Sequence, residues 1–451
     1  MVPVYKGGAK SCPSNYRPIA LLSLVSKVME KIVLKRLSPF LDPLLSPKQS
    51  GFRKRDSTSL QLLRLVQEWS DSLDSSHLIG VIFFDFKKAF DRVCLPGLIL
   101  KLEAAGLQGK ALEWCKSFLL DRCQRVCVGG QVSSIAPLFA GVPQGAILSP
   151  LLFSLYINDV VESTDANFNL FADDTSAYVC DKSASALQVK LQTVLDKLSI
   201  WFNSWAITVN HSKSAIMVVT TRRNVPKVDV HLNGINLPQV TSHKHLGLIF
   251  NSRLTWSDNS AFIAGKASRK IGLLRRLRFR LPRLVLRSLY LTCVRPTMEY
   301  ACGAWAGVGS QDALRLERTQ RAAARLIAGV SLREKLPSDL LLARAGLDPL
   351  SLRRQVTLCS TVYNLSQTVP KGPPHLVNFF NHWTGAVALS KSVMRLRSQD
   401  TASTRLPRPR SELLRRSPFY QAISILNSIP ATVKQSWASL KAHLLSSPVS
   451  S

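Results

Sequence analysis

Seven consecutive residues without a charged side chain, Leu78 to Phe84, run directly into a carboxylate at Asp85. A short, continuous apolar run of this kind predicts a strand that is covered on both faces. A carboxylate beside such a strand is costly unless it is paired or binds a cation. Asp is also a common cap and turn residue, so Asp85 alone does not establish a functional site.

A second group of carboxylates lies between two short strand-like segments. Phe168 to Phe171 and Thr175 to Val179 predict the strands, and Ala172-Asp173-Asp174 joins them as a hairpin. An Asp pair in a hairpin turn is by itself usually structural. Together with Asp85, however, three carboxylates could hold two divalent ions about 3.5–4 Å apart, which clamp the attacking and leaving oxygens of a phosphoryl transfer. Hard oxygen ligands of this kind favour Mg²⁺ over zinc.

Helical periodicity surrounds these strands. Apolar residues recur at helical spacing in Pro18 to Leu37, Asp56 to Trp69 and Leu187 to Trp205. Two further strands are predicted at Ala215 to Thr220 and Leu246 to Phe250. Helices and strands mixed in this order predict an α+β domain that extends to about residue 255.

The chain is strongly basic, because 59 Lys and Arg face 28 Asp and Glu, which gives a formal net charge of +31. Hydrophobic residues make up 46% of the chain, enough to fill folded cores. A globular protein with this charge is expected to bind a polyanion, with nucleic acid ahead of an acidic membrane surface. Composition alone leaves open a ribosomal or chromatin-type binding protein.

The basic residues become denser after the α+β region. Between Asn259 and Met298 no acidic residue occurs, and leucines alternate with Lys and Arg. This pattern predicts helices with one buried and one basic face. Arg405 to Arg410 is too rich in proline for a helix or a central strand, which indicates an extended basic linker. A final helical stretch is predicted near Phe419 to Leu445.

Several classes of protein are disfavoured. No apolar run approaches the roughly 18–20 residues of a membrane span, and the first residues do not resemble a secretory signal. The nine cysteines include no Cys-x-x-Cys pair and no zinc-type spacing. We therefore expect an intracellular protein, nuclear or cytoplasmic, with reduced thiols and no membrane partner. Nothing in the sequence indicates the oligomeric state.

Short blocks of sequence then follow one another in a specific order. They are Asn15-Tyr16-Arg17-Pro18-Ile19, Gln49-Ser50-Gly51-Phe52-Arg53, Phe84 to Asp91, Gly141 to Gly145 with Leu148-Ser149-Pro150, Phe171 to Asp174, Trp205 to Ser214, and His245-Leu246-Gly247. In this order and spacing they resemble the reverse transcriptases of non-LTR (LINE-type, jockey-like) retrotransposons. The resemblance covers about residues 5–250 and continues more loosely through the helical tail.

The resemblance implies a right-hand polymerase with fingers, an antiparallel palm sheet and a thumb, followed by a basic all-helical C-terminal region. The implied domains are partial fingers at 1–77, a palm at 78–255 with an inserted fingers segment at about 95–140, and a basic helical thumb at 256–335. A C-terminal helical region at 336–451 would carry the Pro/Arg-rich linker near 403–411. The implied activity is RNA-directed DNA synthesis by two-metal nucleotidyl transfer, with an RNA template, a DNA primer and dNTPs as partners.

The resemblance also assigns roles to single residues. Asp85 and Asp173 would be the principal ligands of two Mg²⁺ (or Mn²⁺) ions, with Asp174 a looser ligand and the main-chain oxygen of Phe86 completing one shell. Phe90 would pack under the sugar and exclude a 2′-hydroxyl, although an ordinary core aromatic is the commoner fate of such a residue.

Further roles concern the nucleotide and the nucleic acid. Gln144 and Gly145 would border the new base pair, and Lys213 would protonate the leaving pyrophosphate, although a solvated loop lysine is as common. The remaining implied contacts are Lys6 and Arg17 on the triphosphate, Leu246 and Gly247 at the primer 3′ end, and Lys266, Arg269, Lys270, Arg275, Arg276, Arg278 and Arg280 along the template–primer duplex.

Two departures from the family leave alternatives open. The chain opens inside the first polymerase block, at Pro3 to Lys6, so the earlier part of the fingers is expected to be missing. Ala146 stands where the family more often has a small hydroxyl residue. An amino-terminally truncated, catalytically inactive relic that only binds nucleic acid is therefore the alternative. A different palm-type polymerase, such as an intron maturase, is a third reading that Phe90 and the helical tail disfavour.

Overall fold

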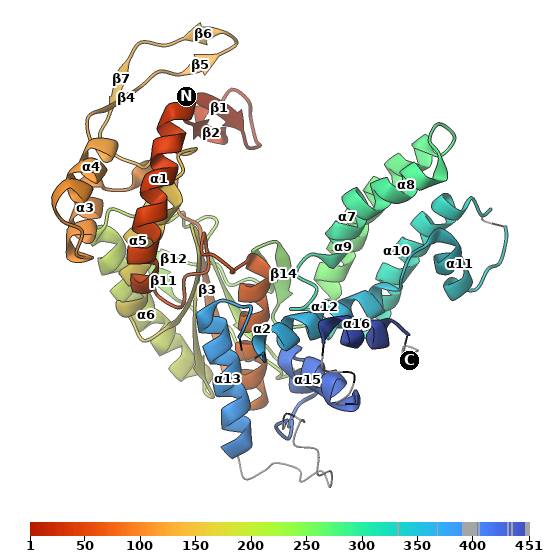
Figure 1. Ribbon diagram of the computed structural model, residues 1–451. Coiled ribbons are helices and arrows are strands. Elements are labelled where there is room, and N and C mark those ends of the chain that lie inside the picture. The colour runs from red at the N-terminus through yellow and green to blue at the C-terminus, as the bar shows by residue number, and fades with distance from the viewer. Residues whose placement is uncertain are drawn as a thin grey trace.

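The computed structural model describes residues 1–331, 333–367, 369–389, 404, 406–430, 433 and 436–446. A central body carries two arms that rise on either side of it (Figure 1). One arm, which we call the fingers, contains the N-terminus, and the other, which we call the thumb, begins after the last strand. The expected α+β class, with an antiparallel sheet at the base of two arms, is confirmed.

The body is built on a four-stranded antiparallel sheet in the order β10-β3-β9-β8. Its strands are β3 (Leu78–Phe84), β8 (Asn167–Phe171), β9 (Asp174–Asp181) and β10 (Ala215–Val219). All seven residues of β3 are buried, as a run of apolar residues covered on both faces predicts. The predicted hairpin and the predicted strand near 215–220 are therefore confirmed.

The sheet separates two hydrophobic cores because successive side chains of a strand point to opposite faces. Ile79, Val81 and Phe83 pack in one core, with α2 (Thr58–Asp74) and the thumb. Leu78, Ile82 and Phe84 pack in the other, with α5 (Ser149–Ile157) and α6 (Ala184–Ser204). Gly80 permits the close approach of α6, because a Cβ there would lie 2.7 Å from Cδ1 of Leu191.

The fingers consist of small strand pairs and helices. They are β1 (Val2–Tyr5), β2 (Tyr16–Ile19), α1 (Leu24–Leu41), α3 (Leu95–Ala104), α4 (Gly109–Leu119), β4 (Arg122–Gln124), β5 (Cys127–Val128), β6 (Gln131–Val132) and β7 (Ala136–Leu138). Short 3-10 turns occupy Pro13–Asn15, Asp42–Leu44, Ala89–Arg92 and Asn158–Glu162. The helix predicted between Pro18 and Leu37 is thus present, and it begins later, after the β-strand that contains Pro18.

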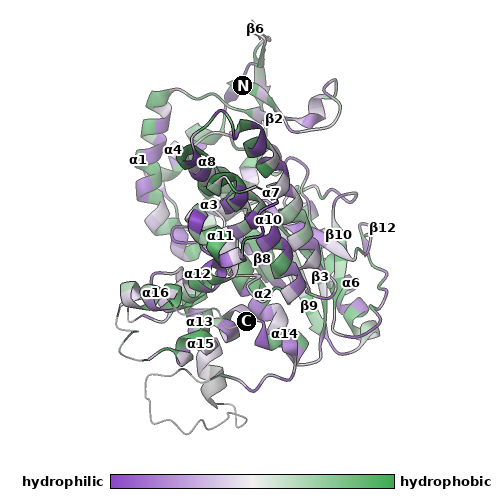
Figure 2. Ribbon diagram, turned by 90° about the vertical axis from the view of Figure 1, so that its right-hand side faces the viewer, coloured by the Kyte–Doolittle hydropathy of each residue, from purple (hydrophilic) through white to green (hydrophobic). Residues whose placement is uncertain are grey.

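The apolar stripe that predicts α1 does not face the core. Leu24 and Val25 are each 80% exposed, and Val28 and Ile32 are 60% and 56% exposed. Figure 2 shows hydrophobic and hydrophilic residues alternating along this helix at the edge of the molecule. Periodicity therefore predicts the helix correctly, but it does not say whether the apolar face meets the protein's own core.

Among the described residues outside the central sheet and the fingers, the strands form two small pairs, β11 (His231–Leu232) with β12 (Ile235–Asn236) and β13 (Ser242–His245) with β14 (Leu248–Asn251). After β14, every element in the described residues is helical, as expected. The helices are α7 (Ser257–Leu277), α8 (Arg283–Leu289), a π-helix (Tyr290–Val294), α9 (Arg295–Glu299), α10 (Ser310–Ala328), α11 (Ser338–Ala345), α12 (Leu350–Leu365), α13 (Pro374–Leu389), α14 (Glu412–Arg415), α15 (Pro418–Ser428) and α16 (Trp437–Ser446).

Three local differences from the sequence expectations have physical causes. The strand predicted from Leu246 begins only at Leu248, because Leu246 and Gly247 form a turn with positive φ angles of 45° and 86°. The final helical stretch is interrupted between α15 and α16, where Pro430 stands. Within the predicted basic linker, residues 403 and 405 lie outside the described residues, and 406–409 form neither helix nor strand.

The C-terminal helix α13 packs along α2 and covers the outer side of this buried helix. His375 lies 3.2 Å from Asp56, and the Trp383 indole donates to Asp71 at 3.2 Å. Gln67 donates to the same Asp71 oxygen. Burial raises the pKa of Asp71 to about 7, and the hydrogen bonds from Trp383 and Gln67 act in the opposite direction. The described helices include none long and apolar enough to cross a membrane.

The raised pKa of Asp71 predicts a specific pH dependence of stability. Between about pH 4 and pH 7 the unfolded chain releases a proton that the folded chain keeps, so stability falls as pH rises through this window and levels off above it. The Asp71→Asn variant lacks this loss. We expect its free energy of unfolding, relative to wild type, to rise by about 2–3 kcal/mol from pH 5 to pH 8 in urea titrations.

The Asp165→Asn variant is the control, because the side chain of Asp165 is fully exposed. Its difference from wild type should stay constant between the two pH values. An Asp71→Asn variant that tracks wild type at both pH values would show that Asp71 is ionised in the folded protein at pH 5.

Candidate functional site

Strand register brings the three acidic residues together at one end of the central sheet. Phe84 of β3 pairs with Thr175 of β9, so Asp85 follows on one strand where Asp174 precedes on its neighbour. Phe171 pairs with Asp174, which leaves Ala172 and Asp173 as the two residues of the β8–β9 turn. Ala172 takes a positive φ of 57°, which allows this tight connection.

Main-chain contacts from the fingers hold this turn in place. Ser50 N donates to Leu170 O at 2.9 Å, and Leu170 N donates to Lys48 O at 3.0 Å. The fully buried Gln49 accepts through Oε1 from Gly51 N at 2.9 Å and from Ala172 N at 3.4 Å. The block Gln49 to Arg53, which the sequence indicates only as a motif, therefore supports the acidic turn.

The charges at this edge interact with one another. The pKa of Asp174 is raised, first by burial and then by the negative charges of Asp173 and Asp85, while Arg17 and Lys6 act in the opposite direction. Four other residues predicted from the sequence therefore lie within electrostatic reach of Asp174, although the segments that carry them are far apart in the chain.

Two residues that the sequence analysis did not single out hold Asp85. Asn210 Nδ2 donates to Asp85 Oδ2 at 2.9 Å, and Ser214 Oγ accepts from Asp85 N at 3.1 Å. The predicted Lys213 lies between them in the same loop, and its side chain is exposed. Both residues lie in the sequence block Trp205 to Ser214, and their place in this block was the available signal.

The donor set suits a divalent cation, because burial and the negative charges of Asp173 and Asp85 raise the pKa of Asp174, and a bound cation would offset these charges. Asp85, Asp173 and Asp174 could hold such an ion together with main-chain oxygen. Within the described part of the chain, no group of three or more His, Cys, Asp or Glu side chains is arranged as a metal site as it stands. One oxygen of Asp85 accepts a hydrogen bond from Asn210, so an ion there would share this oxygen with Asn210 or bind the other one.

A second part of the site surrounds Phe90. Its ring stacks on Phe153 of α5, with 4.4 Å between ring centroids and 19° between planes. Gln144 Nε2 donates to Asp91 Oδ1 at 2.9 Å, and Gln144 O accepts from Ala20 N at 2.7 Å. Both the side-chain amide and the main-chain carbonyl of Gln144 are therefore hydrogen-bonded within the protein, and the sequence did not indicate the bond to Asp91.

Backbone packing explains the glycine at position 145. Its φ is 117°, and a Cβ there would lie 2.8 Å from the Ala20 carbonyl oxygen of the fingers. The adjacent residues, Ile147 and Leu148, donate their N–H groups to Glu30 Oε2 of α1 at 2.6 and 3.2 Å. Glu30 is 1% exposed and satisfies donors at the start of α5, which joins the fingers helix to the loop.

The turn at Leu246 and Gly247 joins β13 to β14, and β13 packs against the sheet near the acidic residues. The His243 ring stacks on Phe83, with centroids 4.0 Å apart. Burial lowers the pKa of the neighbouring His245 to about 3, which keeps that ring neutral at ordinary pH. Leu246 is 9% exposed, so only the backbone of this turn, rather than the leucine side chain, is available to a ligand.

The predicted thumb residues fall into two groups. The side chains of Lys266, Arg269, Arg275, Arg276, Arg278 and Arg280 are exposed. Lys270, in contrast, donates to Cys293 O at 2.6 Å and to Thr297 Oγ1 at 2.7 Å, within the thumb itself.

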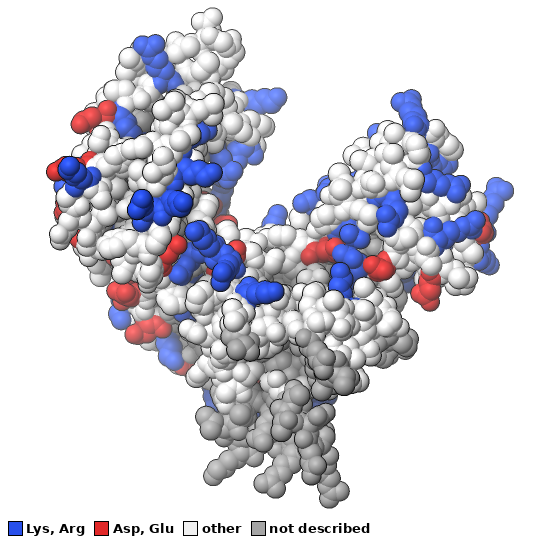
Figure 3. Space-filling model, in the orientation of Figure 1, with Lys and Arg blue, Asp and Glu red and all other residues white. Residues whose placement is uncertain are grey.

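Figure 3 shows a hollow between the two arms, with Lys and Arg side chains on the surfaces beside it.

The chain is similar to proteins of known kind. A family model described as reverse transcriptase (RNA-dependent DNA polymerase) matches residues 4–250. The probable RNA-directed DNA polymerase from transposon X-element of Drosophila melanogaster is 30% identical over 70% of this chain and 36% of its own length. The RNA-directed DNA polymerase from mobile element jockey, from the same fly, is 34% identical over 54% of this chain and 27% of its own length.

A more distant relative, the Pol polyprotein from retrotransposable element R1 of Bradysia coprophila, is 28% identical over 75% of this chain and 35% of its own length. The chain thus spans about a third of the length of the curated relatives it matches. Among solved structures, apo telomerase from Candida tropicalis covers 79% of this chain and 61% of its own, at 13% identity and a TM-score of 0.38.

The packing of Gly51 predicts the effect of a single methyl group. In Gly51→Ala, the Cβ would lie 2.4 Å from Ala172 N and 3.0 Å from Phe171 C, both of them backbone atoms. We expect a loss of about 1–3 kcal/mol in unfolding free energy. Amide exchange over residues 170–174 should accelerate more than elsewhere. Gly265→Ala, where a Cβ meets open space on α7, is the control and should melt no lower than wild type.

Proposed function

The chain belongs to the reverse transcriptase family, and we propose that it extends a DNA 3′ end on an RNA template by two-metal nucleotidyl transfer, as the polymerase of a non-LTR retrotransposon. The observation that carries this proposal is the convergence of Asp85, Asp173 and Asp174 at one end of the sheet, where burial and the charges of Asp173 and Asp85 raise the pKa of Asp174. Arg17 and Lys6 reach the same place from the fingers.

Each part of the site has a task in this reaction. Divalent ions held by Asp85, Asp173, Asp174 and the main-chain oxygen of Phe86 would stabilise the attacking 3′ oxygen and the leaving pyrophosphate. Arg17 and Lys6 would bind the triphosphate as fixed cations. These assignments use residues that already interact electrostatically.

The loop beside α5 would form the nucleotide's other side. The Phe90 ring is held by its stack on Phe153, so it cannot easily swing away from a sugar packed against it. A 2′-hydroxyl would then be excluded by contact rather than by a repulsive charge. Gly145 would let the backbone approach the base pair, and Gln144, through its bond to Asp91, would hold the loop in shape.

The remaining roles concern proton transfer and nucleic-acid binding. The exposed Lys213 would protonate the pyrophosphate, and the Leu246–Gly247 turn would contact the primer 3′ end. The exposed thumb residues would contact phosphates of the template–primer duplex, which makes binding strongly salt-dependent. Lys270 would act indirectly, by fixing α7 to the π-helix and α9.

Removing the acidic residues tests the proposed chemistry. In Asp85→Asn or Asp173→Asn, the rate of DNA extension on an RNA template with Mg²⁺ should fall roughly 10³-fold, because transition-state charge stabilisation is lost. Asp165→Asn, at a fully exposed position, should extend normally. Salt-sensitive RNA binding by the wild-type protein without any incorporation would reject the proposal in favour of a non-catalytic binding protein.

The Phe90 contact predicts nucleotide selectivity. In Phe90→Val, the ratio of ribonucleotide to deoxynucleotide incorporation should rise roughly 10- to 100-fold, because the smaller side chain leaves room for a hydroxyl. Phe139→Val removes a phenylalanine that is 83% exposed on the fingers, and it should leave this ratio unchanged. A Phe90→Val enzyme that still rejects ribonucleotides as wild type does would assign Phe90 to the core alone.

A further inference from the structure

One tyrosine connects the thumb to the turn at Leu246 and Gly247. Tyr300 immediately follows α9, where the α7–α9 hairpin returns to the body. Its hydroxyl donates to the Leu246 carbonyl at 2.8 Å and shares a hydrogen bond of 2.9 Å with Thr58 Oγ1, at the first residue of α2. A single phenol group thus joins the thumb, the turn and the helix that supports the sheet.

The same side chain limits the conformations of the turn. Leu246 and Gly247 have φ angles of 45° and 86°, and the left-handed conformation is unfavourable for leucine without support. The Tyr300 ring lies so close to Gly247 that a Cβ there would be 2.9 Å from Cε1. The ring covers one residue of the turn while the hydroxyl holds the carbonyl of the other.

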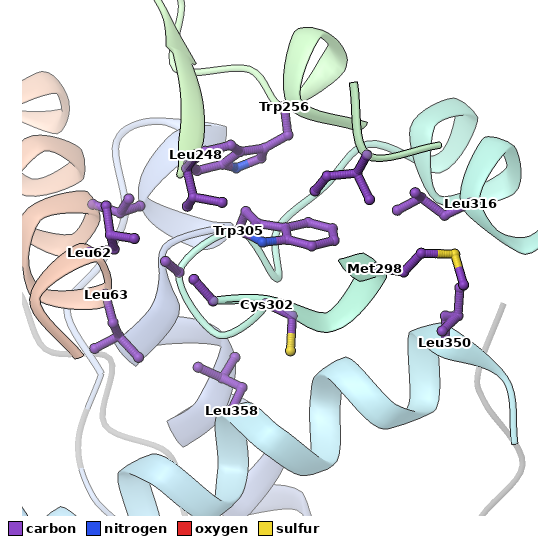
Figure 4. Close-up of a cluster of buried hydrophobic side chains, with 14 of the residues drawn as sticks. Leu62, Leu63, Leu248, Trp256, Met298, Cys302, Trp305, Leu316, Leu350 and Leu358 are labelled. Atoms are coloured by element: carbon purple, nitrogen blue, oxygen red, sulfur yellow. The ribbon is translucent and has the colours of Figure 1, made fainter. Parts of the chain in front are cut away.

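Tyr300 is itself fixed by the core beneath it. The Tyr300 carbonyl accepts from Trp305 Nε1 at 3.0 Å, and Trp305 is fully buried. Figure 4 shows the Trp305 ring between Leu248 of β14 and Met298 of α9, with Leu62 of α2 close by. The tyrosine, 38% exposed at the surface, is therefore attached to a rigid support.

From the turn, packing continues to the acidic residues. β13 leads from the turn to His243, whose ring stacks on Phe83 of β3, two residues before Asp85. A displacement of the turn would therefore shift the end of the sheet where the three acidic residues lie.

We propose that Tyr300 is a positioning residue, which holds the Leu246–Gly247 turn so that a primer 3′ end resting on it is aligned with Asp85 and Asp173. This inference rests on the proposed polymerase function. Loss of the hydroxyl loosens the turn without removing any of the exposed basic side chains that would bind phosphate. The rate of nucleotide addition then falls while the affinity for the duplex stays the same.

The test uses three substitutions that each remove one hydroxyl. Tyr300→Phe keeps the ring over Gly247, and Thr58→Val removes the neighbouring hydroxyl. Tyr290→Phe is the matched control, because the Tyr290 hydroxyl bonds Gln320 in the same thumb at 2.5 Å and does not touch the turn. Pre-steady-state extension of a bound template–primer gives the rate and the amplitude of the first nucleotide addition separately.

In Tyr300→Phe the burst rate should fall about 3- to 10-fold, with the burst amplitude and the duplex dissociation constant within twofold of wild type. Tyr290→Phe, a purely structural loss, should change the amplitude at most. Thr58→Val combined with Tyr300→Phe should slow the burst less than the product of the two single effects, because both act on one contact. An unchanged burst rate in Tyr300→Phe, or an equal loss in Tyr290→Phe, overturns the inference.

Amide exchange over residues 245–248 in the free protein separates this inference from the proposed function. Exchange there should be faster in Tyr300→Phe and unchanged in Tyr290→Phe. If the wild-type protein adds no nucleotide, the proposed function fails whatever the exchange shows. If the wild-type protein is active and exchange at the turn does not respond to Tyr300→Phe, the positioning role alone fails.

Discussion

Three acidic side chains lie close together at the end of a buried sheet, and the proposed chemistry depends on this convergence. Strand register alone puts Asp85 beside Asp174, and the tight turn adds Asp173. Burial raises the pKa of Asp174 further, while two cations from the fingers offset part of the effect. A site whose members repel one another in this way is stabilised when a cation binds, which is the chemistry that the family's reaction uses.

The cluster stays in place because segments remote in the chain form hydrogen bonds with main-chain groups of the turn and of the neighbouring loop. Gln49 and Gly51 support the acidic turn, and Glu30 holds the start of α5. The contacts of Gln49 and Gly51 with the turn do not use the side chains of Asp173 and Asp174. The geometry of the acidic end of the central sheet therefore depends on the early part of the fingers.

The sequence predicts the central strands and the acidic residues because burial on both faces and turn chemistry leave clear local patterns in β3 and the β8–β9 hairpin. Contacts between distant segments leave no such pattern. Nothing in the spacing of Asn210, Asp91 or Tyr300 indicates their partners. The sequence also does not show which way a side chain points. Lys270 resembles its exposed neighbours in sequence, yet it forms hydrogen bonds within the thumb. The apolar stripe of α1 predicts a buried face, yet it is exposed.

The exposed apolar stripe of α1 and the high positive charge call for opposite salt concentrations when the chain is purified. A net charge of +31 retains cellular polyanions at low ionic strength, and high salt is the means of stripping them. The same salt screens the repulsion that keeps copies of the chain apart, and salting-out anions strengthen contacts between exposed Leu24, Val25 and Val28. A chloride salt, which salts proteins out only weakly, removes bound polyanions, and a mild detergent or a polar substitution on α1 limits contacts between copies of the chain.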